Sequence, residues 1–215
     1  MALVDNFDSY SNGSLNGQGS WSGSTGPQVQ GTVVQAGSKA ILVNGNFNPG
    51  VKKSFTAAAT GSQVFYMRED STSSKGFAFH IYGDSGATLL CQFVFVDGNI
   101  TLYTNGTSAT LVTGFTINTW YKGEIEWDGP GDLLRARVND GAWSSWYATP
   151  AFTNADTIEL SSYGGFTANG YYDSLSAAAA SGPANLKTYN TNVKANIKSI
   201  NTNLLANIKS LDTNV

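Results

Sequence analysis

From residue 1 to about residue 180, the chain consists of short runs of alternating apolar and polar residues, separated by Gly, Asn and Asp. A period of two turns one face of a β-strand to a core and the other to water. Pairs such as Asp97-Gly98 and Asn105-Gly106 are typical of tight hairpin turns. Because no helical period separates the runs, the pattern predicts an all-β, two-sheet antiparallel sandwich of the jelly-roll type. The predicted strands are Gln28–Gln35, Ala40–Val43, Lys53–Ala59, Gln63–Arg68, Phe77–Tyr82, Leu89–Val96, Ile100–Tyr103, Ala109–Phe115, Trp120–Trp127, Leu133–Val138, Thr157–Ser161 and Tyr171–Ser176.

A second pattern, with a period of eleven residues, occupies positions 185–215. Its apolar residues recur at spacings of three, four and four. Eleven residues in three turns give about 3.67 residues per turn, which favours a weakly right-handed supercoil. One helix cannot bury such a stripe against itself, so residues 183–215 are predicted to form a coiled-coil stalk that joins copies of the chain, with a parallel trimer favoured. The predicted seam is Leu186, Tyr189, Asn190, Val193, Ile197, Ile200, Asn201, Leu204, Ile208, Leu211 and Val215.

Other structures remain open for this segment. They are a single amphipathic helix lying on the chain's own globular domain, a disordered tail and a repetitive β-structure. Residues 178–182, which are rich in alanine and end at glycine, are the predicted linker between the two parts of the chain.

Composition excludes several classes of protein. Charged residues make up only 13% of the chain and the net charge is −3, so no basic footprint for nucleic acid is expected. No stretch is apolar enough to cross a membrane, and the first residues lack the basic and apolar regions of a secretion signal. Cys91 is the only cysteine, so no disulfide framework is expected, and its apolar neighbours predict a buried, inert thiol.

Three phrases of the sequence resemble a known group of domains. Asp5–Trp21 (DNFDSYSNGSLNGQGSW), Thr119–Asp128 (TWYKGEIEWD) and Gly170–Leu175 (GYYDSL) are similar to the first, central and last strands of concanavalin-like, laminin-G-like jelly rolls. The resemblance covers residues 3–177 and implies one such domain over 1–177, with its last strand paired to its first. This fold hosts lectins, glycanases and structural modules, so it does not decide function. The stalk separately resembles eleven-residue repeats of phage fibre-like and virion surface proteins.

Glu124, Glu126 and Asp128 alternate along one predicted strand, so their carboxylates point the same way. A retaining glycosidase needs two carboxyl groups about 5–5.5 Å apart, and neighbours at i and i+2 stand about 6.6–7 Å apart at the backbone. Jelly-roll glycanases carry E-x-D-x-E on such a strand, whereas this chain has E-x-E-x-D. We therefore predict a solvated acidic strand face and no catalytic residues, with a glycoside hydrolase using Glu124 and Glu126 as an alternative.

Three aspartates are candidate metal ligands. If the first and last strands pair, the carboxylates of Asp5, Asp8 and Asp173 could approach one another, and carboxylate oxygens are typical Ca²⁺ ligands. The resemblance also implies a structural Ca²⁺, because related jelly rolls often hold one. The alternative is that Asp5 and Asp8 accept hydrogen bonds in turns and at a sheet edge. No other cofactor is expected.

His80 is the only histidine, which excludes a site built from several histidines. Strand alternation turns it away from the apolar face of Phe77, Phe79 and Ile81, so we predict a surface or groove histidine. Sugar recognition would use aromatic rings with nearby amides, but the sequence does not single out a site. The candidates considered are Trp143, Trp146, Tyr147, Tyr163, Tyr171 and Tyr172, with Asn139, Asn154 and Asn169 near them.

Together these features predict a non-enzymatic, homo-oligomeric virion surface protein, either a capsid decoration protein or a fibre. Its jelly-roll head is a candidate glycan-binding module displayed on the coiled coil. The expected partners are further copies of the chain, other virion proteins and cell-surface glycans, and not nucleic acid or membrane. The alternatives are a carbohydrate-binding module at a bacterial surface and, less favoured, a glycanase.

Overall fold

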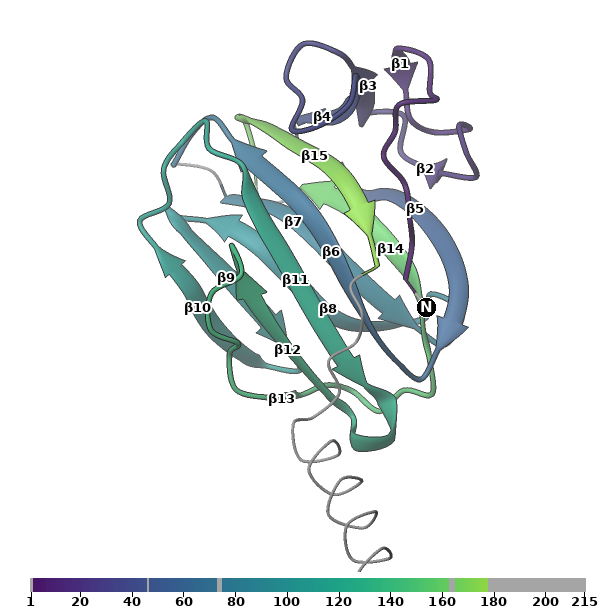
Figure 1. Cartoon of the computed structure of the whole chain (residues 1–215), viewed down its shortest axis with the longest axis vertical. Coiled ribbons are helices and arrows are strands. Elements are labelled where there is room, and N and C mark those ends of the chain that lie inside the picture. The colour runs from purple at the N-terminus through teal and green to yellow at the C-terminus, as the bar shows by residue number, and fades with distance from the viewer. Residues whose placement is uncertain (1, 46, 73–74, 163–164, 178–215) are drawn as a thin grey trace, which may run out of the picture. The chain divides into compact units, whose positions relative to one another are not determined.

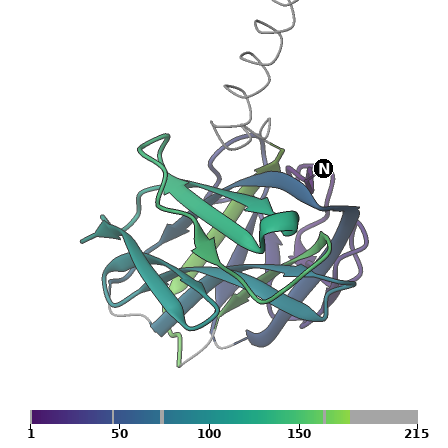
Figure 2. The same ribbon diagram turned by 90° about the horizontal axis from the view of Figure 1, so that it is seen from below.

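The computed structural model describes residues 2–45, 47–72, 75–162 and 165–177. The predicted linker, 178–182, and the predicted coiled coil, 183–215, lie outside the described residues. The described strands form two antiparallel sheets that pack face to face (Figures 1 and 2). No helix in the described ranges is long and apolar enough to span a membrane.

The eight-stranded sheet has the order β1 (Gly13–Ser14), β3 (Gln28–Gln30), β4 (Ala40–Asn44), β15 (Asn169–Ser176), β6 (Thr60–Glu69), β11 (Tyr121–Asp128), β12 (Leu133–Val138) and β13 (Tyr147–Ala148). The seven-stranded sheet has the order β10 (Thr107–Thr113), β9 (Asn99–Thr104), β8 (Thr88–Val96), β7 (Lys75–Gly83), β14 (Ala155–Ser162), β5 (Phe47–Ala58) and β2 (Ser22–Gly23). One turn of 3₁₀ helix, Gly129–Gly131, joins β11 to β12. The predicted all-β, two-sheet sandwich is therefore confirmed.

Each predicted strand is present, with ends that shift by a few residues. The largest difference is β5, which begins at Phe47 rather than Lys53. The sequence Asn48-Pro49-Gly50 is typical of a strand break. The strand nevertheless continues, because an irregularity in the pairing between β14 and β5 accommodates these residues. Three two-residue strands, β1, β2 and β13, were not predicted, because so short a run carries no measurable period.

The core lies between the sheets and is rich in aromatic rings. Phe65 from one sheet stacks on Phe79 from the other, with ring centroids 3.8 Å apart. The same ring fills the space beside Gly123, where a Cβ would clash with it. Cys91 belongs to this core, so the predicted burial of its thiol is confirmed. Burial raises the pKa of the thiol to about 12, which disfavours the reactive thiolate.

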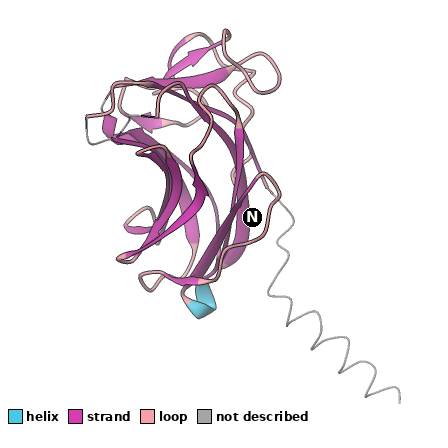
Figure 3. Cartoon of the chain, turned by 90° about the vertical axis from the view of Figure 1, so that its left-hand side faces the viewer, coloured by secondary structure: helices cyan, strands magenta, loops and turns pink. Residues whose placement is uncertain are grey.

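The outer face of the seven-stranded sheet, which turns away from the other sheet, is concave (Figure 3). Alternation directs Ala78, Val94, Thr101 and Ser161 to this face, because their neighbours Phe77, Phe79, Phe93 and Leu160 lie in the core. These four outward residues are small and are exposed by at most 6%. Side chains on the concave side of a curved sheet crowd together, so small and little-exposed residues are expected there. We call this surface the concave face.

Candidate functional site

One row of residues crosses six strands of the concave face. Each residue stands directly opposite the next in the strand pairing, from β5 through β14, β7, β8 and β9 to β10. Opposite residues of antiparallel strands point to the same face, so all six side chains share the concave face. Five strand spacings of about 4.8 Å make the row about 24 Å long. This set, called the polar row below, consists of Lys52, Glu159, His80, Gln92, Tyr103 and Ser108.

Glu159 is the buried anchor of the polar row. Its side chain accepts a hydrogen bond from the Tyr82 hydroxyl at 2.6 Å and another from the backbone amide of Gly50 at 2.5 Å. His80 Nδ1 lies 3.6 Å and Lys52 Nζ 3.5 Å from its Oε2 atom. Glu159 is only 1% exposed. Its carboxylate therefore fixes the positions of the groups around it and is closed to a ligand.

The surroundings of Glu159 also set its charge. Burial disfavours the ionised carboxylate, but the interactions with His80, Tyr82 and the Gly50 amide outweigh that cost and lower the pKa of Glu159 to about 2. Burial and the neighbouring carboxylate raise the pKa of Tyr82 well above its usual range, so this hydroxyl stays a donor. Lys52 Nζ lies 4.0 Å from the centre of the Tyr82 ring. The result is a locked, ionised network at one end of the row.

Gly50 is required at its position because its backbone approaches β14 closely. A Cβ there would overlap the carbonyl oxygen of Leu160. Only glycine allows this approach, which carries the Gly50 amide to the carboxylate of Glu159. The Pro49-Gly50 pair therefore has a structural purpose within the strand.

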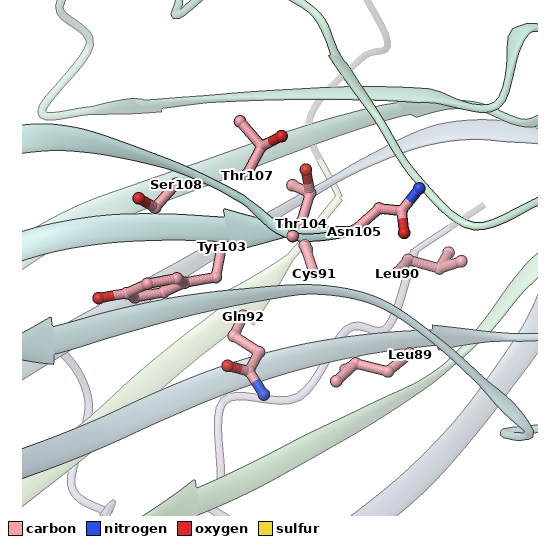
Figure 4. A pocket seen from close by; sticks show the side chains of 10 residues that line it. Leu89, Leu90, Cys91, Gln92, Tyr103, Thr104, Asn105, Thr107 and Ser108 are labelled. Carbon is pink, nitrogen blue, oxygen red and sulfur yellow. The ribbon is translucent and has the colours of Figure 1, made fainter.

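The other end of the polar row is open. Tyr103 is 37% exposed, which makes it one of the few large hydrophobic side chains at the surface of the described residues. Beside it lies a pocket of about 340 Å³, bordered by Leu89, Leu90 and Gln92 of β8 and by the β9–β10 turn at Asn105. Figure 4 shows the Tyr103 ring and the Gln92 amide at one end of this pocket and the two leucines towards the other. An exposed ring beside a planar amide is a suitable surface for an uncharged polar ligand.

The pocket lies where the pairing of β8 with β9 ends. That pairing runs from Val96 opposite Asn99 to Gln92 opposite Tyr103, and β9 itself ends at Thr104. On its other side β8 stays paired with β7 as far as Thr88, through an irregularity in register. The pocket therefore lies beside the part of β8 that extends past the end of β9, and it shares Gln92, Tyr103 and Ser108 with the polar row.

His80 lies on the concave face, as the alternation predicts, but it is only 3% exposed. The sequence predicts a surface or groove histidine. His80 does lie on a hollow face, but it is not accessible at the surface. The Tyr82 ring, whose centre lies 6.1 Å from that of His80, and the Glu159 carboxylate lie against it on this face.

Glu124 and Glu126 lie on β11, on the outer face of the eight-stranded sheet and not on the concave face. They share one face as predicted, but they are 5% and 2% exposed. Arg137 Nε lies 2.8 Å from Glu124, and Arg135 Nε lies 2.7 Å from Glu126. The prediction of a solvated acidic face is therefore wrong, because the next strand supplies one arginine to each carboxylate.

Trp143 and Trp146 cover these ion pairs. Both rings lie 4.6 Å from the guanidinium of Arg135, and Trp143 lies 4.4 Å from that of Arg137. The segment between β12 and β13 that carries them is not a strand, and both indoles stay partly exposed. The indoles form the outermost layer of a stack of carboxylate, guanidinium and aromatic ring.

Replacing Glu124 with glutamine is expected to lower the free energy of unfolding by about 1–3 kcal/mol, because Arg137 loses a charged acceptor at a buried site. Urea unfolding measures this loss. The Glu126→Gln variant is the matched control and should behave alike. Loss of sugar release from β-glucans in either variant would instead favour the glycanase alternative.

Asp5 lies between the sheets, where four donors surround it. It accepts hydrogen bonds from Lys53 Nζ at 2.8 Å, the Tyr10 hydroxyl at 2.6 Å, Trp21 Nε1 at 2.9 Å and the backbone amide of Phe7 at 3.0 Å. Its backbone pairs with Leu175, so the first and last segments of the domain meet as the resemblance implies. A carboxylate enclosed by N–H and O–H donors has no free direction for a cation.

The other two predicted metal ligands hold the loop of residues 31–39. Asp8 accepts a hydrogen bond from the Ser38 amide at 2.6 Å, and Asp173 accepts one from the Gln35 amide at 2.7 Å. The three carboxylates therefore meet three separate sets of donors and do not converge. Within the described ranges, no group of three His, Cys, Asp or Glu side chains could hold a metal ion. Asp5 and Asp8 accept hydrogen bonds of the kind that the alternative to a calcium site predicts, and the calcium site itself stays a prediction.

Among the aromatic residues that the sequence suggested for sugar binding, Tyr172 lies in the core and Tyr163 lies outside the described residues. Tyr171 lies on the eight-stranded sheet, 5.2 Å from the guanidinium of Arg68. None belongs to the polar row. Tyr103 was missed, although a signal existed. The two-residue Asp97-Gly98 turn fixes the register of β8 against β9 and so pairs Tyr103 with Gln92.

Acid is expected to destabilise the protein through Glu159. Because the folded-state pKa is about 2 and the ordinary value is 4.5, this group stabilises the fold above pH 4.5 and loses that contribution as the pH falls towards 2. The loss should reach about 2 kcal/mol by pH 3. Urea unfolding of the wild type and of Glu159→Gln at pH 7 and pH 3 isolates this contribution, since other carboxylates titrate in both. Equal losses in the two proteins would contradict the assignment.

No protein-family model matches the chain, and no curated protein matches it. Solved structures do resemble its fold. A sialidase superposes with a TM-score of 0.62 at 10% identity over 84% of this chain, which spans only 18% of that protein's length. The cellulose-induced protein Cip1 gives 0.54 at 14% identity, over 82% of this chain and 96% of that one. A Bacillus licheniformis β-glucanase gives 0.50 at 15% identity, over 83% and 98%.

These likenesses define the class of fold. The described part of the chain is a concanavalin-like jelly-roll sandwich, as the resemblance of its sequence implies. At sequence identities of 10–15% these likenesses concern the fold alone.

Proposed function

We propose that the chain carries a non-enzymatic glycan-binding domain that uses the polar row. The observation that carries this proposal is the exposed Tyr103 ring beside Gln92, on a row whose charged members are held in place. The C–H face of a sugar ring packs on an aromatic side chain, while its hydroxyl groups need donors and acceptors of fixed direction. Two proteins of the same fold, the sialidase and the β-glucanase, are named for acting on glycans, which supports the proposal.

The length of the row favours an oligosaccharide over a single sugar. A ligand that follows the row crosses the strands for about 24 Å. It would meet the exposed ring of Tyr103 at one end and the ammonium group of Lys52, 35% exposed, at the other. Few charges are available to it, since Lys52 lies beside the carboxylate of Glu159. We therefore favour a neutral or weakly charged chain.

The arrangement of carboxylates favours binding over hydrolysis. A glycosidase places two carboxyl groups on either side of the scissile bond. The polar row contains one, Glu159, and its oxygen atoms accept hydrogen bonds from Tyr82 and Gly50. Glu124 and Glu126 are each paired with an arginine on the other sheet. These contacts support a role as a binding module.

A glycan array probed with the full chain tests this function. We expect at least one class of oligosaccharide to be retained, and no release of reducing sugar when the same glycans are incubated with the protein. An array without any bound glycan would contradict the binding proposal, and sugar release would contradict its non-enzymatic part.

We further propose that the glycan-binding head belongs to an oligomeric virion surface protein, a capsid decoration protein or a fibre. This proposal rests on the eleven-residue repeat of residues 183–215, whose apolar stripe needs partner chains. Several weak sites joined by one stalk bind with an avidity far above that of one site. The alternative is a carbohydrate-binding module at a bacterial surface, which would need the head alone to bind well.

Light scattering on the full chain and on a version that ends at Ala180 tests the oligomer. We expect a multiple of the 22.7 kDa chain mass, with a trimer favoured, and a monomer after truncation. A monomeric full chain would remove the basis for the virion proposal and leave the glycan-binding proposal in place.

A further inference from the structure

We infer that the pocket at the Tyr103 end of the polar row is a subsite for the acetamido group of an N-acetylhexosamine unit. This inference rests on the proposed function and adds to it the chemical class of the glycan. Four properties of the pocket carry it: its size, its apolar side, its strand edge and its lack of charged side chains.

The size of the pocket suits one substituted sugar. Its volume of about 340 Å³ lies at the lower end of the range for small-molecule sites. It shares Gln92, Tyr103 and Ser108 with the polar row. A sugar ring that packs on Tyr103 can therefore direct one substituent into the pocket while the rest of the glycan continues along the row.

One side of the pocket is apolar. Leu89, Leu90 and Cys91 of β8 border it together, but Leu90 and Cys91 are only 1% exposed and belong to the core, so Leu89 is the apolar side chain of the three that a ligand can reach. A hydroxyl group placed against Leu89 would lose hydrogen bonds to water, whereas a methyl group would gain from burial by about 0.8 kcal/mol for a group of that size. The acetyl methyl is the apolar group that common hexoses gain when the 2-hydroxyl is replaced by an acetamido group.

The third property of the pocket is that it borders the edge of a strand. Past Gln92, the described pairing of β8 is with β7 alone, so its second backbone edge borders the pocket beyond the end of β9. Such an edge presents N–H and C=O groups in alternation. An acetamido group carries one N–H and one C=O, as a peptide does, and can pair with an edge of this kind. A hydroxyl also donates and accepts, but from a single oxygen atom, so it matches two separated backbone groups less well.

The lack of charged side chains around the pocket disfavours charged sugar substituents. The residues that border it, Leu89–Gln92 and Tyr103–Ser108, include no ionisable carboxylate, lysine or arginine. A carboxylate or sulfate placed there would be buried without a counter-ion, which is costly. The pocket thus favours an uncharged substituent that is apolar at its tip and has a donor and an acceptor at its base.

Calorimetry with matched pairs of glycans tests the inference on the full chain. The pairs are the β1,4-linked tetramers of N-acetylglucosamine and of glucose, and N-acetyllactosamine and lactose. In each pair that binds, we expect the acetamido member to bind about tenfold more tightly. Leu89→Asn should reduce this preference severalfold and leave the affinity for the unsubstituted member within about twofold. Circular dichroism checks that the variant is folded.

The outcomes separate the two proposals. Equal affinities within a pair, or stronger binding of the unsubstituted member, would overturn the subsite and leave the glycan-binding function standing. Binding on the array only of glycans without N-acetylhexosamine would do the same. If no glycan binds at all, both proposals fail. If Leu89→Asn does not fold, the preference of the wild-type chain within each pair still decides the inference.

Discussion

Replacing Tyr103 with alanine is expected to weaken glycan binding by about 30-fold, the effect of removing one central aromatic contact of about 2 kcal/mol. The side chain is 37% exposed and lies at the open end of the polar row, next to the pocket. The free energy of unfolding should change by less than about 1 kcal/mol, because little buried surface is lost. Calorimetry with a glycan that the array identifies, together with urea unfolding, measures both effects.

Tyr171→Ala is the control for this variant. It removes the same kind of ring from the outer face of the other sheet, where Tyr171 packs against Arg68 and Trp120. Its glycan affinity should equal that of the wild type. Equal losses in the two variants would mean that stability, and not contact with the sugar, explains the result. A loss confined to Tyr171→Ala would place the glycan on the wrong sheet for our proposal.

Replacing Glu159 with alanine is expected to lower the free energy of unfolding by about 3–5 kcal/mol, the usual cost of removing one member of a buried charged pair. The change removes the acceptor for the Tyr82 hydroxyl and the Gly50 amide, and the negative charge that faces His80. It also leaves a cavity where the side chain was packed. Urea unfolding at pH 7 measures the loss.

Two further variants give stability losses with which the loss in Glu159→Ala can be compared. The glutamine variant keeps the size and one acceptor, so it should cost less than alanine. Asp140→Ala removes an exposed carboxylate, 61% accessible at its side chain, that pairs with Lys122, and should leave the free energy of unfolding almost unchanged. If Glu159→Ala were as mild as Asp140→Ala, the buried network would not be the anchor of the polar row.

The strands could be predicted from the sequence because local signals determine them. Alternation marks β7 and β8, and the Asp97-Gly98 turn fixes the hairpin that follows. The same local rule placed Glu124 and Glu126 on one face. Alternation did not predict the partners of these two carboxylates, because burial and ion pairing depend on the neighbouring strand and on a loop. That loop places Trp143 over Arg137.

The polar row could be predicted only in part. Gln92 and Tyr103 meet through a two-residue hairpin, so their pairing follows from the sequence. Glu159 meets His80 across 79 positions of the chain, and it meets Lys52 across 107. No local pattern specifies such pairings, which depend on the order of strands in the sheet. The burial of His80 beside Glu159 has the same origin.

The central claim is that the concave face binds a glycan along the polar row. The most direct test is a titration of ¹⁵N-labelled protein with a glycan from the array, followed by the chemical shifts of the backbone amides. We expect the shifts to concentrate on β7, β8 and β9, with Gln92 and Tyr103 among the largest, and to leave β11 and β12 unchanged. Shifts that concentrate around Trp143 and Arg137, on the opposite sheet, would contradict the account.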